Sequence, residues 1–188
     1  MADEWIIQGG VTQAAQIADF YTSLVDTNAQ VNLSNQTIAT WLEHLALKSV
    51  LELLNMDESQ FPGRTLTTGA TSANLLGLAV ARQQLCSWVH STEIYSAADN
   101  GCDITIKVFS AGAHASIAKV ASILGIGRLN VLELLDPSED SGPCSFDLIR
   151  LESELKRCND LGQGAIVVPS VGEVNTVSHP SAHSISSA

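Results

Sequence analysis

The feature that most constrains the fold is an alternation, from about residue 65 onward, between short strand-like runs and longer segments with helical periodicity. Strands that alternate with helices favour a parallel sheet joined by right-handed crossovers. We therefore expect an α/β fold, with a mostly parallel sheet flanked by helices. The strand-like runs are 65–68 (a strand or a turn), 104–109, 130–134 and 165–168, and the helical segments are 73–89, 116–124 and 146–158.

Two further helices are expected before this alternation begins. Apolar residues recur at three- and four-residue intervals over residues 11–30 and again from Ile38 to about Asn55. Residues 57–64 contain Pro62-Gly63 and are expected to form a loop. The expected organisation is a helical segment over 1–60, an α/β domain over 61–176 and an irregular tail over 177–188.

Composition excludes several classes of protein. The chain has 188 residues, of which 45% are hydrophobic and 15% charged, which is typical of a globular protein. A net charge of −11 argues against a nucleic-acid partner, because phosphate binding needs a basic surface. No apolar run reaches the roughly 20 residues of a membrane span. The acidic N-terminus is unlike a signal peptide, so a cytoplasmic location is expected.

The cysteines give no sign of a metal site. Cys86, Cys102, Cys144 and Cys158 form no CxxC pair and show no metal-ligand spacing. We expect four free thiols and no bound metal.

A small, hydroxyl-rich segment at residues 67–74 precedes the helical pattern of 73–89. Its small residues would let a phosphate approach the backbone, and a following helix offers unpaired N–H groups. The segment is neither a Walker A motif nor a GxGxxG motif. An ordinary capped helix start is the alternative interpretation.

His114 follows a predicted strand, at the end where open α/β sheets bind ligands. An imidazole there can stack on a heteroaromatic ring or take part in proton transfer. A structural histidine is the alternative. The other four histidines, His44, His90, His179 and His183, are interpreted as structural or solvent-exposed.

In its motifs the chain resembles the group II pyridoxal-phosphate-dependent amino-acid decarboxylases, over about residues 10–176. The resemblance rests on four stretches in the family's order, namely 10–12 with 26–31, 63–78, 114–125 and 168–176. It implies part of the large domain of a fold type I pyridoxal-phosphate (PLP) enzyme with N-terminal helices. It also implies a homodimer and an amino-acid substrate, such as tyrosine, another aromatic amino acid or glutamate.

The resemblance assigns roles to five residues. Gly69, Ala70 and Thr71 would hold the phosphate of PLP. His114 would stack on the pyridine ring as the catalytic residue, and Ser170 would lie near the edge of the cofactor. Residues 172–174 read Gly-Glu-Val where the family often has Gly-Thr-Thr, so they receive no role.

Three family motifs do not occur in the chain: the aspartate that pairs with the pyridine nitrogen, the His-Lys pair with the Schiff-base lysine, and an N-terminal His-Pro. We therefore expect a carboxy-lyase truncated before that lysine and inactive as a free chain. The alternatives are a non-catalytic remnant or dimerising interaction protein, and another fold type I PLP enzyme such as an aminotransferase or carbon–sulfur lyase.

Overall fold

The fold was analysed in a computed structural model, which describes residues 11–25, 37–89, 101–138, 142 and 144–170. The chain divides into two compact units, Met1–Thr65 and Leu66–Ala188.

The described residues of the first unit form two helices, α1 (Gln13–Leu24) and α2 (Ala39–Leu53). The side chain of Thr12 caps α1 by accepting a hydrogen bond from the N–H of Ala15 at 3.3 Å. Both helices were expected from the apolar periodicity. The expected end of the first helix, near residue 30, lies outside the described residues.

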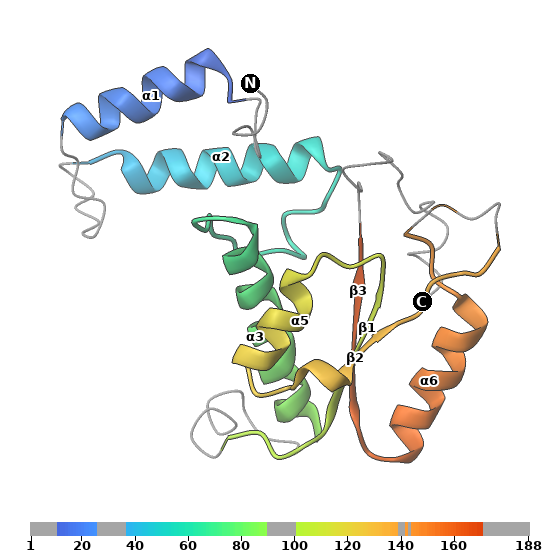
Figure 1. The fold of residues 1–188 in the computed structure, drawn as a ribbon. Helices are drawn as coiled ribbons and strands as arrows, with labels where there is room; N and C mark the ends of the chain where they lie inside the picture. Colours follow the sequence, from blue (N-terminus) through green and yellow to red (C-terminus); the bar gives the residue numbers. More distant parts are fainter. Residues whose placement is uncertain (1–10, 26–36, 90–100, 139–141, 143, 171–188) are drawn as a thin grey trace. The chain divides into compact units, whose positions relative to one another are not determined.

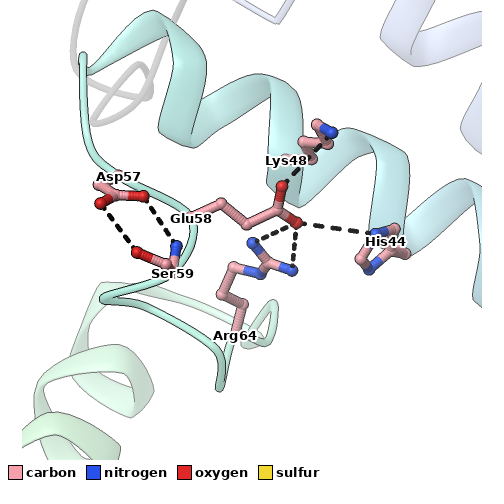
Figure 2. Close-up of polar contacts among 6 residues, drawn as sticks. All are labelled: His44, Lys48, Asp57, Glu58, Ser59 and Arg64. Atoms are coloured by element: carbon pink, nitrogen blue, oxygen red, sulfur yellow. Dashed lines mark hydrogen bonds and ion pairs between the residues drawn. The ribbon is translucent and has the colours of Figure 1, made fainter.

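The loop after α2 is held to that helix by Glu58 (Figure 2). Arg64 donates two hydrogen bonds of 3.1 Å to Oε1 of Glu58, and Nζ of Lys48 lies 3.3 Å from Oε2. His44 lies 3.9 Å from the same carboxylate. The pKa of Glu58 is lowered, first by the hydrogen bonds from Arg64 and then by Lys48. The loop at 57–64 is therefore present, and ion pairs hold it in place.

The second unit is built on a parallel sheet of three strands in the order β2-β1-β3. β1 (Ile106–Ala111) lies in the centre and pairs in parallel with β2 (Val131–Glu133) and β3 (Gly164–Pro169). The predicted parallel sheet is confirmed. The segment 65–68 is not a strand: the chain bends at residues 68–69, where the N–H of Gly69 donates to the carbonyl of Thr67 at 3.0 Å, and a helix follows.

Helices cover both faces of this sheet (Figure 1). On one face α3 (Ala70–Val89) and α5 (Ser116–Ile123) pack against Val108 of β1. On the other face α6 (Leu148–Asp160) packs against Phe109, the next residue along β1. The side chains of Val108 and Phe109 point to opposite faces, and both are fully buried, as a central strand in a three-layer α/β fold requires.

The cysteines correct one expectation. Cys86 of α3 and Cys102, just before β1, form a disulfide with a Cα–Cα distance of 5.6 Å. Cys144 and Cys158 are free and buried. The prediction of four free thiols was wrong for the first pair, because folding brings together two residues that are 16 positions apart.

In the described part of the chain, no helix has the length and apolar character that crossing a membrane requires.

Candidate functional site

The carboxyl ends of the three strands meet around the turn that follows β1. Ser110 of β1 is in register with Glu133 of β2 and with Val168 of β3. The hydroxyl of Ser110 donates a hydrogen bond of 3.1 Å to Glu133, and the N–H of Gly112 donates to the same carboxylate. Polar contacts from β2 therefore hold the start of the turn.

The other neighbouring strand holds the same turn through Ser170. The hydroxyl of Ser170, just after β3, donates a hydrogen bond of 3.2 Å to the carbonyl oxygen of Gly112. Gly112 has φ = 64°, in the left-handed region where a side chain would be strained. Ser170 is thus close to the His114 turn, and its hydroxyl contacts the backbone of that turn.

His114 lies in this turn, two residues before the first buried residue of α5. Its side chain is exposed, and Nδ1 faces Ser116. The N–H of Ser116 lies 3.2 Å from Nδ1 and donates to it, while Oγ of Ser116 lies 2.9 Å from the same nitrogen. His114 is therefore an exposed side chain with a fixed ring orientation.

A hydrogen bond joins helix α3 to the side chain of Ser116, the residue that contacts His114. Nδ2 of Asn74, in the second turn of α3, donates a hydrogen bond of 2.8 Å to Oγ of Ser116. Ser116 is only 4% exposed, so this contact is shielded from bulk water. One buried hydroxyl thus connects the start of α3 to His114.

The first residues of α3 form an open turn. Gly69 has φ = 99°, and a side chain at this position would meet no atom within 4 Å. The carbonyl of Gly69 accepts from the N–H of Ser72 at 3.1 Å. Ala70 and Thr71 are exposed, and their N–H groups make no hydrogen bond with any described residue. The turn therefore offers two free donors at the positive end of a 20-residue helix.

A hollow of about 180 Å³ lies at the opposite end of the sheet, where β1 begins. It surrounds the start of β1 and the residues before β2, away from the strand ends that carry His114 and Ser170. Its lining residues are Arg82, Cys102, Ile104, Thr105, Ile106, Gly125, Ile126 and Asn130.

The structure links two of the predicted site elements, His114 and the N-terminal part of α3, and it brings Ser170 to the His114 turn. The roles assigned to Gly69, Ala70, Thr71, His114 and Ser170 remain predictions. Sequence reasoning missed the three residues that support them: Asn74, Ser116 and Glu133. Asn74 and Ser116 lie inside the two quoted motifs, so polar residues at their helical positions were the available signal.

Comparisons by sequence identify no relative. No protein-family model matches the chain. No curated protein shows significant similarity to it.

Comparison of structures does find neighbours. The glutamate decarboxylase domain of diaminobutyrate-pyruvate transaminase and L-2,4-diaminobutyrate decarboxylase from Vibrio parahaemolyticus matches with a TM-score of 0.67 and 18% identity, over 90% of this chain and 36% of that chain. Oryza sativa TDC with PLP and tryptamine matches with a TM-score of 0.65 and 22% identity, over 89% and 35%. The same enzyme with PLP matches with a TM-score of 0.63 and 22% identity, again over 89% and 35%.

This chain spans about a third of the length of each of these neighbours. At identities of 18–22% the likeness concerns the fold. The three-layer α/β fold with its parallel sheet thus matches part of the fold of PLP-dependent decarboxylases.

Proposed function

We propose that this chain carries the cofactor-binding part of a PLP-dependent amino-acid decarboxylase. The observation that carries the proposal is the connection between two elements at one end of the sheet. The open turn at Gly69 begins the helix whose Asn74 reaches Ser116, and Ser116 contacts His114. The likeness to decarboxylases in fold supports the same class of enzyme.

The residues present fit the phosphate of PLP. The N–H groups of Ala70 and Thr71 are free among the described residues, and Gly69 leaves open space beside them. A helix N-terminus with free N–H groups favours an anion through both hydrogen bonds and the helix dipole. Gly69, Ala70 and Thr71 would therefore hold the phosphate, and the exposed ring of His114 would face the aromatic ring.

When bound, PLP supplies an electron sink for the pair of electrons that remains when carbon dioxide leaves an amino acid. This chain's part is to anchor the phosphate at Gly69–Thr71 and to offer the imidazole face of His114. Ser170 and Glu133 keep the turn of His114 in place through Gly112.

None of the four lysines of the chain is suited to the covalent attachment of PLP. Lys48 pairs with Glu58, Lys156 pairs with Glu152, and Lys107 donates a hydrogen bond to Asn130. Lys119 is exposed on α5, on the side opposite the buried Val120 and Ala121. We therefore propose that the 188-residue chain binds PLP without a covalent bond and does not by itself release carbon dioxide.

A second candidate function, association with another copy of the chain, is favoured by the apolar stripe of α1. Ile17, Phe20, Tyr21 and Leu24 recur on one face of the helix, and each is 63–69% exposed. No residue of α1 is buried. An isolated helix of 12 residues is marginal in water, so this stripe is suited to a partner helix.

Titration of the purified chain with PLP, followed by circular dichroism induced in the cofactor band, tests the cofactor proposal. We expect saturable binding that inorganic phosphate competes away. Gly69→Ala forces a side chain into the left-handed region and should weaken binding roughly tenfold, equivalent to about 1–2 kcal/mol.

Gly77→Ala is the matched control, because Gly77 lies within α3 and its added methyl group would meet no atom within 4 Å. We expect this variant to bind PLP as the unaltered chain does. Equal binding by the Gly69 and Gly77 variants, or no competition by phosphate, would contradict the assignment of the phosphate turn.

Borohydride reduction and peptide mapping, with an assay for carbon dioxide, test whether the chain binds PLP without a covalent bond and lacks decarboxylase activity. We expect no single lysine to be labelled stoichiometrically, and no carbon dioxide from tyrosine or glutamate. A stoichiometric label on Lys119 together with carbon dioxide release would show that the chain is an active enzyme.

A further inference from the structure

Three polar groups form a continuous chain of hydrogen bonds that ends on the ring of His114. The amide of Asn74 donates to Oγ of Ser116 at 2.8 Å, and Oγ of Ser116 lies 2.9 Å from Nδ1 of His114. The backbone N–H of Ser116 points to the same nitrogen at 3.2 Å. The three residues come from α3, the first turn of α5 and the loop after β1.

The direction of these bonds determines which ring nitrogen carries the proton. A backbone N–H is only a donor, so Nδ1 of His114 must accept from Ser116 and cannot itself carry hydrogen. Oγ of Ser116 accepts a hydrogen bond from the amide N–H of Asn74. The hydroxyl hydrogen of Ser116 is therefore free to donate to Nδ1 of His114. In a neutral imidazole with an accepting Nδ1, the proton is on Nε2.

We propose that Asn74 and Ser116 are positioning residues that hold His114 in the Nε2–H tautomer. At this end of the sheet His114 then presents a hydrogen-bond donor and a flat ring face, and it does not act as a base through Nε2. The role of this geometry in holding a cofactor rests on the function proposed above. The tautomer itself depends only on the contacts of Ser116.

The burial of Ser116 explains why the arrangement is specific. Ser116 is 4% exposed, so water competes poorly for its hydroxyl, whereas His114 is exposed and its Nε2 makes no hydrogen bond with the described residues. The buried side of the ring is thus fixed and the exposed side is available to a ligand. A histidine without this support would exchange between its two tautomers in water.

The test is long-range ¹H–¹⁵N NMR of the imidazole groups in the full 188-residue chain without cofactor, at a pH where the rings are neutral. His114→Gln identifies the signals of His114 among those of the five histidines. In the unaltered chain we expect an unprotonated Nδ1 and a protonated Nε2. Ser116→Ala removes the hydroxyl but keeps the backbone N–H that donates to Nδ1, so we expect the two nitrogen signals to move part of the way toward those of a mixture of tautomers. In Asn74→Ala, which leaves both contacts of Ser116 with Nδ1 in place, we expect a smaller movement in the same direction.

Ser122→Ala is the matched control, because Ser122 is an exposed serine on the same helix α5. It should leave the His114 signals unchanged. Asn74→Ala replaces a half-buried residue with a strong helix former, so it gives a folded variant even where loss of the buried hydroxyl of Ser116 lowers stability.

PLP titration of the same variants separates this inference from the proposed function. We expect Ser116→Ala to weaken PLP binding roughly three- to tenfold, the usual effect of one lost hydrogen bond. A protonated Nδ1 in the unaltered chain, or unchanged His114 signals in both variants, overturns the inference whatever the affinity for PLP. Absence of PLP binding combined with the expected NMR signals overturns the proposed function alone.

Discussion

At the scale of single residues, Glu58 is the charge that makes the most ion-pair contacts among the described residues of the first unit (Figure 2). Arg64, with a side chain only 13% exposed, donates two hydrogen bonds to it, and Lys48 forms a second ion pair. Hydrogen bonds to the charged form of a carboxyl group lower its pKa. Glu58 therefore links the loop at 57–64 to helix α2 for as long as it is ionised.

Replacing Glu58 with Gln should lower the stability of the chain at neutral pH. Because the pKa of Glu58 is lower in the folded than in the unfolded chain, the carboxylate stabilises the fold above its usual pKa, and this contribution is lost as the pH falls through the lowered value. The difference in urea midpoint between Glu58→Gln and the unaltered chain should therefore be present at pH 7 and vanish in strong acid.

The control for this experiment is Glu52→Gln, which removes an exposed carboxylate of α2 that makes no ion pair with the described residues. Its urea midpoint should stay within error of the unaltered chain at both pH values. An equal loss of stability in both variants, or a difference that persists in acid, would show that the ion pairs of Glu58 do not stabilise the loop.

At the scale of elements, the disulfide joins the C-terminal part of α3 to the segment that enters β1. Cys86 is fully buried in the same cluster as Leu78, Ile106 and Val108, so the bond adjoins the core of one sheet face. A disulfide stabilises mainly by restricting the unfolded chain, and more so for longer loops. The bond therefore fixes the end of α3 beside the central strand, while Asn74 connects the start of α3 to Ser116.

Reduction of this bond should lower the free energy of unfolding by about 3 kcal/mol, the loop-closure value for a separation of this size. Urea unfolding with and without reductant measures the change. The double variant Cys86→Ser with Cys102→Ser should have the lower stability already and show no further response to reductant. An unchanged urea midpoint on reduction would contradict the stabilising role of the disulfide.

The free cysteine Cys158 should behave differently from the disulfide pair. Burial raises the pKa of the Cys158 thiol, so this cysteine should remain unreactive toward alkylation in the folded chain.

At the scale of the whole molecule, exposed apolar surface and net charge have opposite effects on association between copies of the chain. The stripe of α1 is 63–69% exposed, and Ile38 at the cap of α2 together with Trp41, Leu42 and Leu45 of that helix is 37–65% exposed. Exposed apolar faces of this kind are typical of interaction sites. The net charge of −11 favours solubility through repulsion between copies. Burial of a helical stripe usually outweighs such repulsion at physiological salt, where charges are screened.

We expect the chain to self-associate and the double variant Phe20→Gln with Leu24→Gln to shift it toward monomer. Removing two apolar side chains from a buried interface costs about 3–6 kcal/mol, which raises the dissociation constant at least a hundredfold. Sedimentation velocity over a range of concentrations measures the shift. Leu129→Gln is the control, since Leu129 is 93% exposed but lies outside the helical stripes. A monomer at all concentrations, or an equal effect of the control, would count against this interface.

The sequence alone determined the succession of helices and strands and the parallel sheet. Local periodicity carries this information: β1, β2, β3, α5 and α6 lie within two residues of their predicted bounds. The helix α3 begins at Ala70, three residues before its predicted start, because Gly69 turns the chain with a positive φ that apolar periodicity does not reveal.

Contacts between residues far apart in the chain were decided by the tertiary structure alone. The disulfide joins positions 16 apart, Asn74 reaches Ser116 across 42 positions, and Ser170 reaches Gly112 across 58. Spacing in the sequence carries no signal for such pairs, because strand order and helix packing determine which residues meet. The sequence thus singled out His114 as a candidate, and only packing of α3 and α5 on one face of the sheet determined what holds its ring.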